Sequence, residues 1–111
     1  MQRELKKYLF DIQSCIENIE NFVGEPKVFS NFEQNLMLQQ AVERNLEIIG
    51  EAVNGLLKIY PEIKITDARR MVDTRNKIIH SYDEIQPIQI WNIIINHLPL
   101  LKNEVQLLLE N

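Results

Sequence analysis

The sequence predicts an all-α protein that folds as an up-and-down bundle of four to five helices. Only 3 Gly and 4 Pro interrupt its 111 residues, and the apolar side chains between them recur at helical spacing. No stretch of useful length alternates apolar and polar residues as a β-strand does. With 45% hydrophobic residues the chain can build one core, so we expect a single domain over residues 1–111.

The first two predicted helices fill the N-terminal half of the chain. Apolar residues three or four apart from Leu5 to Val23 predict a helix over residues 2–23, which Gly24 and Pro26 end. Asn31 and Gln34 resemble a capping box and predict the start of a second helix that runs to about Tyr60. Its apolar face covers about 160°, wider than the roughly 100° needed to pack against one neighbour. We therefore expect two neighbours, one of which could belong to a second subunit. The apolar positions are Leu5, Leu9, Ile12, Ile16, Ile19 and Val23 in the first helix, and Leu38, Ala41, Val42, Ile48, Ile49, Ala52, Val53, Leu56 and Ile59 in the second.

The C-terminal half predicts a short helix followed by an interrupted one. Thr66 is the expected N-cap of a helix over residues 67–80. Pro87 suits the first turn of a last helical stretch, which Pro99 must kink or divide. The residues expected to face inward are Met71, Val72, Ile78 and Ile79 in the short helix, and Trp91, Ile95, Leu98, Leu101 or Lys102, Val105 and Leu108 in the last stretch.

Composition excludes several classes of protein. The single Cys15 cannot form an intramolecular disulfide, and no signal-like N-terminus or apolar run near 18 residues occurs, so we expect a cytoplasmic protein without a membrane segment. There is no Cys pair or Gly-rich phosphate loop, and His80 and His97 lack ligand spacing. We therefore predict no metal site and no cofactor.

The net charge of −4 argues against nucleic-acid binding by the whole surface, but the charge is uneven. It is −4 over residues 1–57 (five basic, nine acidic), +3 over 58–80 (six basic, three acidic) and −3 over 81–111 (one basic, four acidic). The only basic segment is the one that contains the cluster described next.

The potentially reactive side chains gather between residues 75 and 82. Asn76 and His80 are four residues apart and share a helix face, and Arg75 adjoins it, so the three could converge on one phosphate. Metal-free RNA cleavage needs proton transfer at the 2′-hydroxyl and the leaving oxygen, and a cation for the phosphoryl oxygens. His80 suits the proton transfer and Arg75 the phosphate. A second His80 across a two-fold dimer, Tyr82, or water could complete the acid–base pair.

Structural roles are the alternative for the same residues. His80 could interact with the dipole at a helix C-terminus, and Arg75 could pair with Asp67, Asp73 or an acidic residue of the second helix. We expect packing or surface roles for the other polar and aromatic positions. These are Asn45 as a buried amide with satisfied hydrogen bonds, Arg44, Glu47 and Glu51 as a solvated ion-pair face, Trp91 and Cys15 in the core, and His97 partly exposed.

The run of Arg75, four residues, His80, one residue and Tyr82 resembles the signature of HEPN ribonucleases, in which a polar residue, here Asn76, follows the Arg. Residues 44–52 and the stretch from Trp91 to Pro99 are similar to the HepT-like branch of that superfamily, so the resemblance covers nearly the whole chain. It implies a helical-bundle homodimer whose two motifs face a shared cleft. The implied activity is that of a metal-independent endoribonuclease toxin that cleaves tRNA or mRNA.

The resemblance implies catalytic roles for Arg75 and His80, and supporting or substrate-binding roles for Asn76, Lys77 and Tyr82. It also implies a partner, an MNT-type nucleotidyltransferase antitoxin of a type VII toxin–antitoxin system, which silences the toxin by attaching AMP to a Tyr in or near the motif. Tyr82 is the only local acceptor. An AMP group would add bulk and negative charge where the RNA phosphate must bind.

Two other functions compete with the nuclease. A non-catalytic nucleotide-binding or substrate-binding partner of a nucleotidyltransferase would use Arg75 and His80 to hold a phosphate without turnover, and the acidic total charge favours it slightly. The basic segment around an intact motif favours the nuclease. A plain dimeric scaffold ranks last, because it leaves the cluster unexplained.

Overall fold

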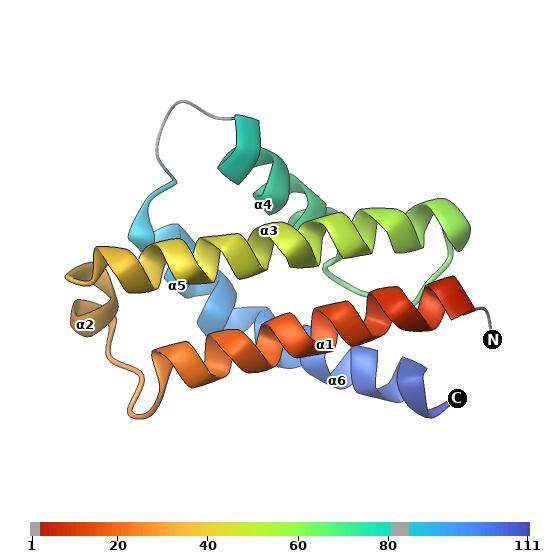
Figure 1. Ribbon diagram of the computed structural model, residues 1–111, viewed down its shortest axis with the longest axis horizontal. Helices are drawn as coiled ribbons and strands as arrows, with labels where there is room; N and C mark the ends of the chain where they lie inside the picture. The colour runs from red at the N-terminus through yellow and green to blue at the C-terminus, as the bar shows by residue number, and fades with distance from the viewer. Residues whose placement is uncertain (1–2, 81–84) are drawn as a thin grey trace.

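The computed structural model describes residues 3–80 and 85–111, and all the regular structure in these two ranges is helical. Helices α1 and α3 lie side by side in opposite directions and form the centre of the bundle (Figure 1). Helix α4 packs on α3, α6 packs on α1, and α5 contacts both α2 and α6. The predicted all-α bundle is confirmed, with six helices in the described ranges rather than four to five. They are α1 (Arg3–Val23), α2 (Phe29–Glu33), α3 (Leu36–Ile59), α4 (Ala68–His80), α5 (Pro87–Asn96) and α6 (Leu98–Glu110).

Helix α1 confirms the first predicted helix. Every predicted apolar position from Leu5 to Ile19 is buried, and Val23 is half-buried. The helix ends at Gly24, whose φ of +68° is a left-handed conformation that a residue with a Cβ rarely adopts. The Gly24 N–H donates to the Glu20 carbonyl oxygen at 2.9 Å, which satisfies one of the last carbonyls of α1.

The predicted start of the second helix was wrong. The short helix α2 precedes α3, and the N-cap of α3 is Asn35 rather than Asn31. Asn35 has an extended backbone, and its side-chain oxygen accepts from the Leu38 N–H at 3.0 Å. The Gln39 side chain donates to the carbonyl oxygens of Phe32 and Glu33, both at 2.9 Å, and so satisfies the end of α2. The cap at Asn35, four residues after Asn31, divides the predicted helix into α2 and α3.

The wide apolar face of α3 is explained within one chain. It packs against α1 on one side and α4 on the other (Figure 1), and Val42, Ile49, Val53 and Leu56 are buried between them. Ile59, at the end of the helix, is 40% exposed. The expectation of two neighbours is confirmed, and neither of them needs to come from a second subunit.

Helix α4 begins at Ala68, one residue later than predicted. Thr66, the predicted N-cap, instead donates its hydroxyl to Glu104 Oε2 at 2.6 Å and its N–H to Glu104 Oε1 at 3.1 Å. Met71 and Val72 are buried as predicted, but Ile79 is 40% exposed and does not face the core. The reason is that the last turn of α4 projects away from α3 (Figure 1).

The division of the last helical stretch at Pro99 is confirmed. Helices α5 and α6 meet at His97, because Pro99 has no N–H to donate and its ring clashes with a continuing helix. The predicted inward position Ile95 is 37% exposed, since α5 takes its own direction against α2 and buries Ile90, Ile93 and Ile94 instead. Trp91 packs its ring against those of Phe29 and Phe32, with centroids 5.8 and 5.4 Å apart, so its predicted core role is confirmed.

No helix within residues 3–80 or 85–111 has the length and apolar character needed to cross a membrane.

Candidate functional site

The second half of α4 carries most of the predicted site. Arg75 and Asn76 are half-buried, whereas Lys77 and His80 are exposed, and His80 is the last residue of the helix. Tyr82, the third signature residue and the candidate acceptor of AMP, lies outside the described residues. The described part of the site consists of α4 and the helices that contact it.

Gly50 lets α4 approach α3 closely at Arg75. A Cβ added at Gly50 would lie 2.3 Å from Arg75 Cβ and 2.6 Å from the Met71 carbonyl oxygen, both far inside ordinary contact distance. A glycine in a helix interior costs stability relative to alanine, and such a residue commonly has a packing reason. At Gly50 the packing reason is the close approach of the α4 backbone. This approach fixes the position from which the Arg75 side chain extends.

Arg75 bonds to an amide and not to a carboxylate. Its Nη1 donates to Asn76 Oδ1 at 3.0 Å, and its Nε is buried without a hydrogen-bond partner among the described residues. Asp67, one of the proposed carboxylate partners, instead lies 3.5 Å from Arg70 Nε and 2.9 Å from His97 Nδ1. Within residues 3–80 and 85–111 Arg75 forms no ion pair, so the structural alternative of a paired arginine was wrong.

The Arg75 side chain lines a groove between α1, α3 and α4 with a volume of about 470 Å³. Tyr8 closes one side by packing its ring over Gly55, where an added Cβ would meet the ring at 2.5 Å. Glu51 and Lys58 bring charges of both signs into the same groove. Glu4 lines the groove as well, so Arg75 borders open space that two acidic and two basic side chains share.

His80 does not share a helix face with Arg75. Five residues along an α-helix correspond to a rotation of about 140° and a rise of about 7.5 Å. Asn76 and His80 do share a face, at about 40° from one another. Within one chain, Arg75 therefore bonds to Asn76, whereas His80 faces solvent on a different side of α4.

The predicted roles of Asn45, Arg44 and Glu47 on α3 are confirmed. The Asn45 side chain is buried, donates to the Ala41 carbonyl oxygen at 2.9 Å and accepts from Asn18 Nδ2 at 3.2 Å. It is the satisfied amide that was expected, and it ties α3 to α1. Arg44 and Glu47 form the expected ion pair, 2.9 Å apart. Glu51 does not join it and lies in the groove beside Arg75.

Two further predictions concern Cys15 and His97. Cys15 is buried at the side of α1 as expected, and burial raises the pKa of its thiol above the ordinary 9.0. His97 was expected to be partly exposed at the surface, and only 18% of its side chain is exposed, beside Asp67. Because Pro99 ends α5 at this point, His97 can reach the start of α4.

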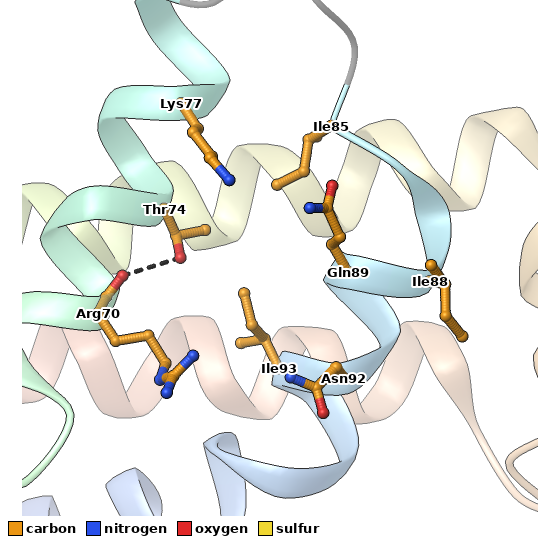
Figure 2. Close-up of a pocket in the computed structure, with 8 residues that line it drawn as sticks. All are labelled: Arg70, Thr74, Lys77, Ile85, Ile88, Gln89, Asn92 and Ile93. Carbon is orange, nitrogen blue, oxygen red and sulfur yellow. Dashed lines mark hydrogen bonds between the residues drawn. The ribbon is translucent and has the colours of Figure 1, made fainter.

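Sequence reasoning missed a cleft on the far side of α4, between it and α5. Arg70, Thr74 and Lys77 line it from α4 (Figure 2). Their spacing of four and three residues, which places them on one helix face, was the available signal. In the described ranges no three His, Cys, Asp or Glu side chains gather as a group that could hold a metal ion.

Comparison with known proteins gives consistent matches over most of the chain. The family model described as "Ribonuclease HepT-like" matches residues 12–108. The chain is 38% identical to the "Probable ribonuclease HepT" of Thermococcus cleftensis, over 96% of each chain. It is 33% identical to a "Putative RNase" of Methanocaldococcus jannaschii, over 96% of this chain and 97% of that one. A "Putative RNase" of Caldanaerobacter subterraneus is also 33% identical, over 89% and 88%. No solved structure matches the chain.

Proposed function

The chain belongs to the HepT-like ribonuclease family of the HEPN superfamily, and from this premise we propose that it is a metal-independent endoribonuclease toxin. The observation that carries the proposal is the state of Arg75. Its guanidinium is held by Asn76, has no carboxylate partner in the described ranges and lies beside a groove. An always-charged fork of N–H donors placed this way suits a phosphate.

The proposed reaction divides the work between two side chains. His80 takes the proton from the RNA 2′-hydroxyl, and the oxygen attacks the adjacent phosphorus and breaks the bond to the 5′-oxygen of the next nucleotide, which takes a proton from water or from the second His80 of a dimer. Arg75 stabilises the charge that develops on the phosphoryl oxygens. Asn76 positions Arg75, and Lys77 attracts the RNA backbone. The arrangement supplies both functions without a metal ligand.

We propose that the working site forms across a homodimer. Arg75 and His80 lie about 140° apart around α4, so a two-fold partner that supplies its own His80 to the first chain's Arg75 gives a more compact site than one chain does.

We also propose that a nucleotidyltransferase antitoxin controls the enzyme by attaching AMP to Tyr82, as in a type VII toxin–antitoxin pair. The modified group would stand two residues after His80 and would place negative charge where the RNA phosphate approaches. Incubation with such an enzyme and ATP should add the mass of AMP to the wild type. If Tyr82→Phe gained the same mass, the assignment of the acceptor would be wrong.

The test of the nuclease is RNA cleavage by purified protein in the presence of EDTA. Arg75→Ala and His80→Ala should abolish cleavage, whereas the control Arg69→Ala removes an exposed arginine of the same helix and should cleave normally. Each variant is checked for folding by circular dichroism. Folded wild type that binds AMP but cuts no RNA would favour the non-catalytic nucleotide-binding alternative.

Mixing the two inactive variants tests the dimer. If Arg75 of one chain acts with His80 of the other, a mixed dimer of Arg75→Ala and His80→Ala chains keeps one intact pair and regains cleavage. If both residues act within one chain, no mixed dimer contains an intact pair and the mixture stays inactive.

A further inference from the structure

The cleft between α4 and α5, called here the α4–α5 cleft, has a volume of about 340 Å³ (Figure 2). This is within the range of small-ligand sites in proteins. Two cationic side chains stand on one wall, and amide and isoleucine side chains stand on the other. The residues are Arg70, Thr74 and Lys77 on α4, Ile85 before α5, and Ile88, Gln89, Asn92 and Ile93 on α5.

The cations of the α4 wall have little carboxylate compensation. Arg70 is half exposed and forms a long ion pair with Asp67, Nε to Oδ1 at 3.5 Å, while the other oxygen of Asp67 bonds to His97. Lys77 forms no ion pair with any residue of the described ranges. The Thr74 hydroxyl donates to the Arg70 carbonyl oxygen at 2.9 Å, so it bonds within the wall. The wall therefore offers two positive charges to an anion.

The α5 wall offers hydrogen-bond donors and apolar surface. Gln89 Oε1 accepts from the Gln86 N–H at 2.9 Å, and Asn92 Oδ1 accepts from Asn96 Nδ2 at 2.7 Å. Each amide oxygen already accepts one hydrogen bond, and its NH₂ group is available to an acceptor on a ligand. Figure 2 shows Lys77 and Gln89 pointing toward one another across the cleft. Ile88, 55% exposed, adds apolar surface at the rim.

We infer that the α4–α5 cleft binds one nucleotide of a single-stranded RNA, next to the nucleotides cleaved at the motif. Arg70 and Lys77 hold its phosphate, the isoleucines contact its ring, and the amides of Gln89 and Asn92 donate to acceptors on the base edge. Lys77 and His80 are three residues apart and so are neighbours on α4, whereas Arg75 faces the other side of the helix, so the strand enters the cleft from His80. An acidic peptide would satisfy the cations but has no base for the α5 wall. This inference rests on the proposed ribonuclease function.

The experiment measures binding of a short fluorescent single-stranded RNA by anisotropy, with His80→Ala as the background that prevents cleavage. Adding Arg70→Ala should weaken binding about tenfold and lower the slope of log affinity against log salt by about 0.7. Adding Asn92→Ala should change the preference among homopolymers and leave that slope unchanged. Arg69→Ala is the matched control on the same helix, because Arg69 is exposed and does not line the cleft.

The subsite and the nuclease can fail separately. If wild type cleaves RNA while Arg70→Ala and Arg69→Ala bind it equally, the subsite is refuted and the nuclease stands. If wild type does not cleave but binding depends on Arg70 and not on Arg69, the subsite stands and the nuclease is refuted. Displacement of the RNA by an equal concentration of poly-glutamate would also overturn the inference, since it would show that charge alone selects the ligand.

Discussion

Replacing Gly50 with alanine tests how α3 positions Arg75. The added Cβ would lie 2.3 Å from Arg75 Cβ, and ordinary contact begins at 3.4 Å, so α4 must move away from α3 by about 3.4 − 2.3 = 1.1 Å. The second clash, at 2.6 Å, is with the Met71 carbonyl oxygen, which is backbone and cannot turn aside. The movement therefore carries Arg75 with the whole helix.

Two opposing effects set the magnitude. Alanine favours a helix over glycine by about 0.8–1.0 kcal/mol, whereas forcing atoms into a packed contact costs about 1–3 kcal/mol. We expect Gly50→Ala to lower the free energy of unfolding by up to about 2 kcal/mol in urea titration. RNA cleavage should fall about 100-fold under conditions where the variant is folded, because a shift near 1 Å in a group that binds the phosphate has that effect.

Gly55→Ala is the matched control in the same helix. There the added Cβ meets the ring of Tyr8, which is half-buried and can turn outward, so the stability should change by less than about 0.5 kcal/mol. Arg75 keeps its place, so cleavage should fall far less than in Gly50→Ala, although Tyr8 lines the same groove. If Gly50→Ala proved as stable and as active as Gly55→Ala, the close approach of α4 would not determine the position of Arg75.

Three further predictions concern stability. Asn45→Ala should lower the free energy of unfolding by about 1–3 kcal/mol in urea titration, because it removes bonds to Asn18 and to the backbone inside the core; a neutral result would mean that the amide does not link the helices. Glu104→Ala should cost about 1 kcal/mol, because the bonds that hold Thr66 at the start of α4 are lost, whereas the exposed Glu110→Ala should be neutral in the same titration. Burial raises the pKa of the Cys15 thiol, so the stability that the neutral thiol contributes is complete below the unfolded-state pKa and is lost as pH rises through the folded-state pKa. Wild type should therefore lose more stability than Cys15→Ala as the pH rises above the ordinary thiol pKa of 9.0, and identical pH profiles would contradict this assignment.

The local periodicity of the sequence determined the all-α class and most helix positions. The apolar spacing of α1 and the stop at Gly24 depend on neighbouring residues along the chain, so they could be predicted without tertiary contacts. The division at Pro99 is equally local, because proline lacks the N–H that a continuous helix requires. The start of α3 was missed because two asparagines, Asn31 and Asn35, offered competing caps, and the bonds from Gln39 to the end of α2 favour the second.

For the candidate site, the sequence determined which residue types lie together on α4, but the environment of each came only from the tertiary structure. From the sequence alone, Arg75 could pair with any of several carboxylates. In the structure α4 packs on Gly50 and Arg75 lines a groove, while Asp67 pairs with Arg70 and His97. The α4–α5 cleft is likewise formed by residues of two separate helices, Arg70, Thr74 and Lys77 on α4 and Ile88, Gln89, Asn92 and Ile93 on α5. Periodicity acts within a few residues of the chain, whereas ion pairs, close approaches and clefts depend on how separate helices pack, and only the tertiary structure decides that.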